Sequence, residues 1–200
     1  MAQLDFWHDF ASTYSYLAAM RAEPLAEAAG VTLSWRPFLL GPIFVAQGWT
    51  TSPFNIYPLK GRYMVRDIER LCLERGLTFR LPEPFPQNSL LAARLALAVP
   101  EALRPAFNRA VYLAEFGEGR SIADEGVLGE ILQRLGLNAA ELFEQARSDS
   151  LRARLRGETQ TAQEIGLFGA PSFVAGDGEI FWGDDRLEQA LAWAKGLRNR

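Results

Sequence analysis

The residues best suited to chemistry in this 200-residue chain are two serines near its start, spaced as Ser12-x-x-Ser15. They follow residues 3–9, whose alternating apolar and polar side chains predict a strand, and Ser12 is a plausible helix N-cap. The hydroxyl and backbone N–H groups at a helix N-terminus favour anions, so this turn could hold a thiolate supplied by a ligand. A serine hydroxyl has no disulfide chemistry, which excludes thiol–disulfide exchange by this pair. Helix capping alone would also explain Ser12.

A second motif, Gly169-Ala170-Pro171, precedes a short apolar run. Because this proline precedes the first strand of a predicted hairpin and should lie opposite the helix of Ser12, we predict a cis Ala170–Pro171 bond. The N–H and C=O of Ala170 would then be free to pair with a bound peptide, as an added strand does. An ordinary turn proline is the alternative interpretation.

The third motif is Gly183-Asp184-Asp185-Arg186. Asp185 with Glu188 three residues later resembles a capping box. The backbone N–H groups of such a helix start can also bind a carboxylate, and a nearby carboxylate side chain can pair with an ammonium. The γ-glutamyl group of glutathione carries both, so a single helix start could recognise it.

The elements that position the first motif alternate between strand and helix. Residues 3–9 and 31–38 have the period of strands, and the apolar pattern between them predicts one helix over 12–30. Pro24 falls inside that helix and should kink it. Strand, helix and strand within about 38 residues favour a right-handed βαβ unit.

The end of the chain returns to strands. Residues 172–175 and 179–182 flank a Gly-containing turn and predict a β-hairpin, and Asp184 or Asp185 should then cap a last helix. Between the two ends, residues 41–58 look like a structured loop rich in Gly, Pro and aromatic residues. The segment from 59 to 166 has helical periodicity throughout.

These elements predict an α/β, thioredoxin-like fold, βαβ…ββα, with a large all-helical insertion. The predicted division is a discontinuous thioredoxin-like domain over 1–40 and 167–200, and an inserted helical domain over 41–166. The insertion point places the helices over the end of the sheet where the first helix begins. Ligands commonly bind in clefts of this kind between two parts of a protein.

The composition excludes several classes of function. The net charge of −3 gives no basis for a nucleic-acid partner, and no run approaches the roughly 18–20 apolar residues of a membrane span. The start of the chain lacks the features of a signal peptide, so we expect a cytoplasmic protein. A single cysteine, Cys72, allows no internal disulfide and is expected to be a small buried residue. With His8 as the only histidine and no metal-ligand spacing, we expect no metal.

Taken together, the motifs resemble the 2-hydroxychromene-2-carboxylate isomerases and, less closely, the kappa-class glutathione transferases, both in the DsbA-like branch of the thioredoxin superfamily. The resemblance spans essentially the whole chain. It is carried by Asp9-Phe10-x-Ser12-x-Tyr14-Ser15-Tyr16-Leu17 after the first strand, Trp35-Arg36-Pro37-Phe38-Leu39-Leu40-Gly41, Phe54-Asn55-Ile56-Tyr57-Pro58, Lys60-Gly61-Arg62-Tyr63, Gly169-Ala170-Pro171 and Gly183-Asp184-Asp185-Arg186-Leu187. The chain departs from the family by having Thr13, where a proline often follows the catalytic serine, and by Asp184, where another polar residue is common.

The resemblance implies glutathione as the cofactor, with its sulfur near Ser12, whose hydroxyl would donate a hydrogen bond to the thiolate. The implied cofactor-binding residues are Ser12, Ala170, Pro171, Gly183, Asp184, Asp185 and Arg186. The implied reaction interconverts 2-hydroxychromene-2-carboxylate and trans-o-hydroxybenzylidenepyruvate, or a related aromatic carboxylate, by reversible thiolate addition. Contacts to this substrate would come from Phe44, Asn55, Lys60 and Asn88, with Arg62 and Arg66 as further candidate cations and Trp49 and Phe54 as further aromatic walls.

The resemblance also implies a homodimer and a role in the catabolism of aromatic hydrocarbons. Two other functions stay open, and a third is disfavoured. A kappa-like transferase would consume glutathione by conjugating it to electrophiles. A non-catalytic peptide-binding module would use the edge at Pro171. A DsbA-like oxidoreductase is disfavoured by Ser12-x-x-Ser15.

Overall fold

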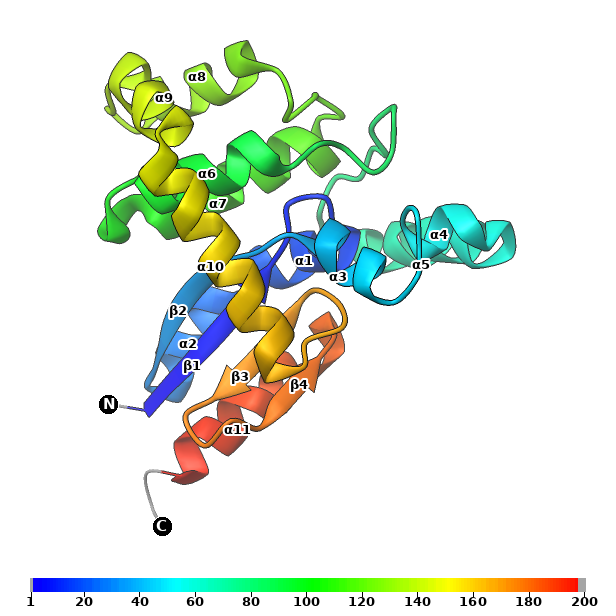
Figure 1. Ribbon diagram of the computed structural model, residues 1–200. Coiled ribbons are helices and arrows are strands. Elements are labelled where there is room, and N and C mark those ends of the chain that lie inside the picture. The colour runs from blue at the N-terminus through cyan, green and yellow to red at the C-terminus, as the bar shows by residue number, and fades with distance from the viewer. Residues whose placement is uncertain (1, 198–200) are drawn as a thin grey trace.

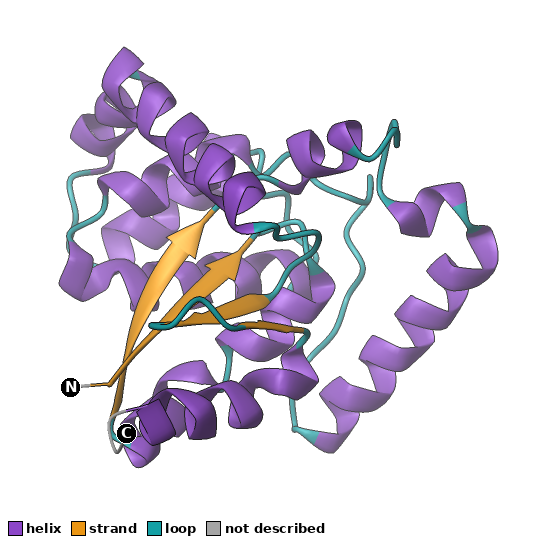
Figure 2. Ribbon diagram, turned by 60° about the horizontal axis from the view of Figure 1, so that its bottom comes forward, coloured by secondary structure: helices purple, strands orange, loops and turns teal. Residues whose placement is uncertain are grey.

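A computed structural model of the protein describes residues 2–197. Its four-stranded sheet has the order β2-β1-β3-β4 (Figures 1 and 2). The central strand β1 (Ala2–His8) pairs in parallel with β2 (Val31–Pro37) and antiparallel with β3 (Ser172–Ala175), which pairs antiparallel with β4 (Ile180–Trp182). The first and last parts of the chain therefore build one sheet, as the βαβ and hairpin patterns predict.

Both faces of the sheet are covered, because β1 carries apolar side chains on each side. Phe6 belongs to the larger core with α1 (Thr13–Ala19), α2 (Ala22–Ala29) and α11 (Leu187–Leu197). Trp7 belongs to a second cluster with α3 (Leu40–Ala46) and α10 (Asp149–Ile165). In Figure 1, α10 crosses the face of the sheet opposite α2 and α11. A strand buried on both faces is suited to the centre of a sheet.

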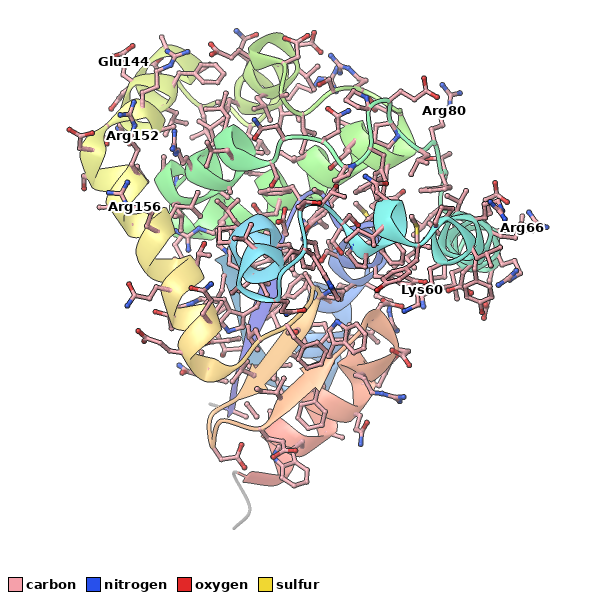
Figure 3. All side chains as sticks on the ribbon, turned by 45° about the vertical axis from the view of Figure 1, so that its right-hand side comes forward. Lys60, Arg66, Arg80, Glu144, Arg152 and Arg156 are labelled. Atoms are coloured by element: carbon pink, nitrogen blue, oxygen red, sulfur yellow. The ribbon has the colours of Figure 1, made fainter. Side chains whose placement is uncertain are left out.

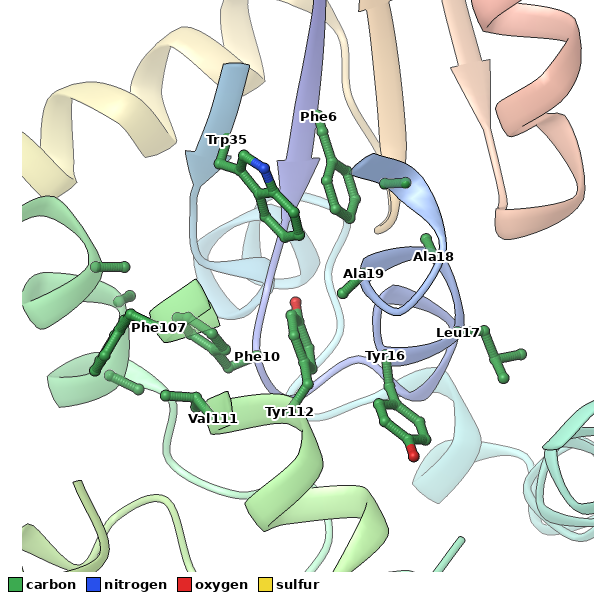
Figure 4. Packing of buried hydrophobic residues seen from close by; sticks show 14 of the residues in the cluster. Phe6, Phe10, Tyr16, Leu17, Ala18, Ala19, Trp35, Phe107, Val111 and Tyr112 are labelled. Carbon is green, nitrogen blue, oxygen red and sulfur yellow. The ribbon is translucent and has the colours of Figure 1, made fainter. Parts of the chain in front are cut away.

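The segment between the sheet halves is helical. Its helices are α4 (Pro53–Ile56), α5 (Pro58–Glu74), α6 (Leu90–Ala98), the 3₁₀ turn η1 (Glu101–Leu103), α7 (Arg104–Tyr112), the π-helical turn η2 (Leu113–Gly117), α8 (Glu125–Arg134) and α9 (Ala139–Arg147). The larger core continues from the sheet into these helices, where Phe6 and Trp35 lie near Phe107 and Tyr112 (Figure 4). One continuous core joins the sheet and the helical segment, so the packing does not separate them into two cores. The division into two domains stays a prediction. Cys72 is buried in this core, as expected.

Two predicted elements differ from the structure. The helix expected over 12–30 is divided at Met20 and Arg21 into α1 and α2, and Pro24 lies in the first turn of α2, where a proline is tolerated. The loop expected over 41–58 contains α3 and α4, whose first turns hold Pro42 and Pro53. In both places a proline that suggests an interruption marks the first turn of a short helix instead. None of the helices within residues 2–197 is long and apolar enough to cross a lipid bilayer.

Candidate active site

The turn after β1 brings the first two motifs together. Ser12 is the N-cap of α1, and its Oγ accepts the N–H of Ser15 at 3.2 Å. The same hydroxyl donates to the carbonyl oxygen of Ala170 at 3.0 Å, although the two residues are 158 positions apart. The Ala170–Pro171 bond is cis, as predicted. The Ala170 carbonyl is not free, however, which corrects the expectation that both of its backbone groups await a peptide.

Asp9 stabilises this turn through hydrogen bonds to backbone N–H groups. Its buried carboxylate accepts the N–H of Ala11 at 3.0 Å and that of Leu40 at 2.7 Å, so it ties the turn to the start of α3. Its backbone carbonyl accepts the N–H of Ser12 at 3.0 Å. Burial raises the pKa of Asp9, and these backbone donors act in the opposite direction. Sequence reasoning placed Asp9 in the serine motif but gave its side chain no role, although an acidic residue directly after a buried strand was a usable signal.

A chain of fully buried hydrogen bonds supports the same turn from α7. The hydroxyl of Tyr112 donates to the carbonyl of Asp9 at 3.0 Å and lies 3.0 Å from His8 Nδ1, while Asn108 Nδ2 lies 3.2 Å from His8 Nε2. These three hydrogen bonds are compatible with one another when Asn108 donates to Nε2 and the Nδ1–H of His8 donates to the Tyr112 hydroxyl. Burial, and then the charge of Arg104, lower the pKa of His8 to about 3. The imidazole is therefore neutral, and because it is fully buried it cannot act as a base toward groups in solvent.

Glu115 lies one turn further along, in the π-helical turn η2. It is buried, and neither carboxylate oxygen has a hydrogen-bond partner among residues 2–197. Burial, followed by the nearby charge of Asp9, raises the pKa of Glu115 well above its ordinary value. A buried carboxylate without a donor is costly, so burial favours the protonated, neutral form of this group. Sequence reasoning missed it because its position in the periodic pattern gives no sign of burial.

The third motif meets the second through a backbone hydrogen bond, in which Gly183 N–H donates to the carbonyl of Pro171 at 3.0 Å. Gly183 has a positive φ of 114°, and a Cβ there would lie 2.5 Å from Oδ1 of Asp185, so glycine is required. The prediction that Asp184 or Asp185 caps the last helix is wrong. The helix begins with the 3₁₀ turn η3 (Asp184–Arg186), which has no side-chain cap.

The side chain of Asp184 already has partners within the chain. Its buried carboxylate accepts from Arg21 Nε at 3.1 Å and from Arg75 Nη2 at 2.7 Å, and Arg21 also pairs with Glu188. Asp184 as a cofactor-binding residue stays a prediction, for which its backbone is the more accessible part. Asp185 is exposed and lies 3.3 Å from the guanidinium of Arg186. Its carboxylate is accessible to a ligand ammonium.

The predicted substrate residues all lie in the helical segment but do not form one cluster. Phe44 packs on Trp49 with ring centroids 5.6 Å apart. Asn55 Nδ2 donates to Thr51 Oγ1 and to the Phe85 carbonyl, both at 3.3 Å. These side chains therefore have local partners within the chain.

Asn88 and Lys60 differ in their surroundings. Asn88 Oδ1 accepts the N–H of Leu90 at 3.1 Å at the start of α6. Lys60 is exposed, with its ammonium 5.2 Å from the ring centroid of Tyr57. In Figure 3, Lys60 lies on the side of α5 nearer the C-terminal hairpin, whereas Arg66 points outward and pairs with Glu69. Of the two, Lys60 is the better placed cation.

An open apolar pocket of about 420 Å³ adjoins the start of α1. It is lined by Tyr14, Phe54, Leu59, Lys60, Tyr63 and Met64. Thr13 Oγ1 donates to Met64 Sδ at 3.3 Å, so the wall of this pocket contacts the residue next to Ser12. Tyr14 donates to Asp67 Oδ2 at 2.9 Å, which fixes its ring. The pocket therefore borders the serine turn and has one exposed ammonium at its lining.

The sheet order, the serine turn and the cis-proline edge define a thioredoxin-like protein without a redox cysteine pair. The chain matches the DSBA-like thioredoxin domain family over residues 3–192 and belongs to that family. It is 31% identical to a 2-hydroxychromene-2-carboxylate isomerase of Sphingobium xenophagum, over 92% of this chain and 94% of that protein.

Two further comparisons also extend over most of the chain. Human glutathione S-transferase kappa 1 is 26% identical, over 92% of this chain and 87% of that protein. A solved structure of a 2-hydroxychromene-2-carboxylate isomerase superimposes with a TM-score of 0.88 at 28% identity, covering 99% of this chain and 96% of that one. The thioredoxin-like α/β fold with a helical insertion is thus confirmed.

Proposed function

We propose that this protein is a glutathione-dependent isomerase that interconverts 2-hydroxychromene-2-carboxylate and trans-o-hydroxybenzylidenepyruvate, or a related aromatic carboxylate. The observation that carries the proposal is the 3.0 Å contact between the Ser12 hydroxyl and the Ala170 carbonyl. It joins a helix N-terminus suited to a thiolate with a strand edge suited to a peptide. Glutathione combines these two features in one molecule.

The residues present fit glutathione. The exposed carboxylate of Asp185 suits the γ-glutamyl ammonium, and the backbone N–H groups of η3 suit its carboxylate. Ala170 and Pro171 provide the edge for the cysteinyl residue, and Ser12 keeps 8% of its surface exposed there. Bound glutathione would supply a thiolate that adds reversibly to a conjugated carbon of the substrate, which permits rotation before elimination.

The Ser12 hydroxyl has one proton, which it can donate either to the Ala170 carbonyl or to a ligand thiolate. In this structure its hydroxyl donates to Ala170, so it must rotate toward a thiolate when glutathione binds. That hydrogen bond and the start of α1 would together lower the thiol pKa, at about 1.4 kcal/mol for each unit. Asp9 and Tyr112 would keep the turn fixed while the hydroxyl changes partner.

The substrate would lie over the helical segment. The apolar pocket next to Thr13 suits a flat ring, and Lys60 in its lining suits a carboxylate. Phe44, Asn55 and Asn88 remain proposed contacts around this region. A homodimer in the cytoplasm and a role in aromatic catabolism also remain predictions, the first testable by sedimentation.

The test is turnover of 2-hydroxychromene-2-carboxylate with catalytic amounts of glutathione, followed by chromatography. We expect interconversion with glutathione recovered unchanged. Asp185→Asn should weaken glutathione binding in calorimetry, while Asp177→Asn, in the distant hairpin turn, should not. Equal affinity of the wild-type and Asp185→Asn proteins for glutathione would contradict the proposed γ-glutamyl site.

A kappa-like transferase is the second candidate, supported by the similarity to human glutathione S-transferase kappa 1. One-for-one consumption of glutathione with an electrophile would establish it instead. If neither reaction occurs across a panel of aromatic carboxylates and electrophiles, the proposed activity is wrong in its substrate or altogether, and a non-catalytic peptide-binding module is the remaining candidate.

A further inference from the structure

Three arginines with little or no carboxylate pairing lie on α6 and α10 where these helices pack together. Arg152 and Arg156 are four residues apart on α10, one turn of the same helix face, as Figure 3 shows. Arg94 lies on α6. Arg154 Nη1 on α10 donates to the Leu97 carbonyl at the end of α6 at 3.0 Å, which places the first half of α10 beside the part of α6 that holds Arg94. In agreement with this packing, burial, and then the positive charges of Arg152 and Arg156, lower the pKa of Arg94.

The chain itself does little to neutralise this cluster. Arg94 Nε is buried with no hydrogen-bond partner among the described residues, and neither Arg94 nor Arg156 pairs with a carboxylate in residues 2–197. Arg152 contacts Asp149 at 3.4 Å, but that carboxylate is fully exposed and such a pair contributes little.

Arg152 and Arg156 are exposed to solvent, whereas Arg94 is half-buried between the two helices. Like charges repel, and a guanidinium with a buried, unbonded N–H costs free energy unless an acceptor arrives. Some other arginines of the same segment do pair with a carboxylate, as Arg147 does with Glu125 at 2.5 Å. A small oxyanion with two negative charges and several acceptor oxygens would satisfy what the chain leaves open, because guanidinium donors match phosphate geometry.

We propose that Arg94, Arg152 and Arg156 form a binding site for a phosphate-type oxyanion. The ligand is either inorganic phosphate or the phosphoryl group of a small phosphate monoester. The site lies on the first half of α10 and on α6, apart from α5 and the turn that begins α1 (Figure 1). Binding there stabilises the helical segment and does not enter the chemistry at Ser12.

The direct test is calorimetry with inorganic phosphate and, separately, with glycerol phosphate, both at constant ionic strength. We expect saturable binding that weakens at least tenfold in Arg94→Met and in Arg156→Met, but not in Arg80→Met. Arg80 is a matched control because it is an exposed arginine on a different part of the surface (Figure 3). The tighter of the two ligands identifies the source of the phosphate.

Thermal unfolding gives a second readout. Without phosphate, Arg94→Met should melt at or above the wild-type temperature, because it removes an unpaired, partly buried charge. With phosphate, only the wild type and Arg80→Met should gain stability, as expected when a ligand binds the folded state. If phosphate gives no saturable heat, or raises the melting temperature of Arg94→Met and Arg156→Met as much as that of the wild type, the site does not exist.

Discussion

The turn from Asp9 to Ser12 and the segment from 41 to 63 face the same proposed reaction but are built differently. The turn rests on buried polar groups, with His8, Asn108 and Tyr112 all inaccessible to solvent. The segment from 41 to 63 contains the short helices α3 and α4 and the start of α5, and it exposes apolar side chains such as Val45 and Leu59. Its Asn55 side chain is exposed and bonds to Thr51 and to the Phe85 carbonyl. The difference suggests that the chemistry is fixed rigidly, whereas substrate choice is left to a surface that can change at little cost in stability.

The largest effect should come from Ser12→Ala. Loss of one hydrogen bond to a thiolate should lower turnover roughly 10- to 100-fold, or about 1.5–3 kcal/mol, without loss of the fold. Ser148→Ala is the matched control, since both serines are N-caps whose Oγ accepts an N–H three residues later at 3.2 Å. It should lose about 1 kcal/mol of stability and no turnover. Full activity in a folded Ser12→Ala protein would refute the role of this hydroxyl.

Glu115→Gln tests whether the support of the turn carries a pH dependence. The raised pKa of Glu115 means that the folded protein holds this proton more tightly than the unfolded chain. Its stabilising contribution is complete below about pH 4.5 and is lost as the pH rises toward the folded pKa, by at most about 1.4 kcal/mol per unit.

Relative to Glu115→Gln, the wild type should therefore lose unfolding free energy as the pH rises from 4.5, in denaturant titrations across this range. Glu144→Gln is the control, because Glu144 is exposed on α9 (Figure 3). Parallel curves for the wild type and Glu115→Gln would show that this carboxyl is not a buried neutral acid.

Tyr112→Phe removes the hydroxyl that links His8 to the Asp9 carbonyl. The buried Nδ1–H of His8 would lose its acceptor, which should cost about 1–2 kcal/mol in chemical unfolding and lower kcat with it. Tyr16→Phe is the matched control, since the hydroxyl of that buried tyrosine donates to the Thr78 carbonyl at 2.8 Å. An equal loss of kcat in both variants would mean that support of the turn is not specific to Tyr112.

The smallest effect should come from the open segment. Lys60→Met should raise KM for an aromatic carboxylate a few-fold, under about 1 kcal/mol, with unchanged stability, because the ammonium is exposed. Arg66→Met, on the outward side of α5, should leave KM unchanged. A large loss of stability in Lys60→Met would erase the contrast between the two regions.

Much of the fold could be predicted from local patterns. Alternation in residues 3–9 and 31–38 and the Gly-containing hairpin turn placed all four strands, because a period of two reflects a strand directly. The interruption at Met20 and the helices within 41–58 could not be predicted in this way. There the choice between loop and short helix depends on packing against the core, which overrides weak local preferences.

By itself, the sequence determined the positions of the four strands, the N-cap at Ser12 and the proline turn before the hairpin, since each depends on residues that are close together in the chain. It could not decide the partners of those groups. The contact of Ser12 with Ala170 spans 158 positions, and the bond from Tyr112 to the Asp9 carbonyl spans 103. Only the tertiary structure showed that Asp184 is consumed by two arginines and that Glu115 is buried without a partner. Burial and pairing of polar groups are properties of the packed chain, because desolvation depends on which distant segments exclude the water.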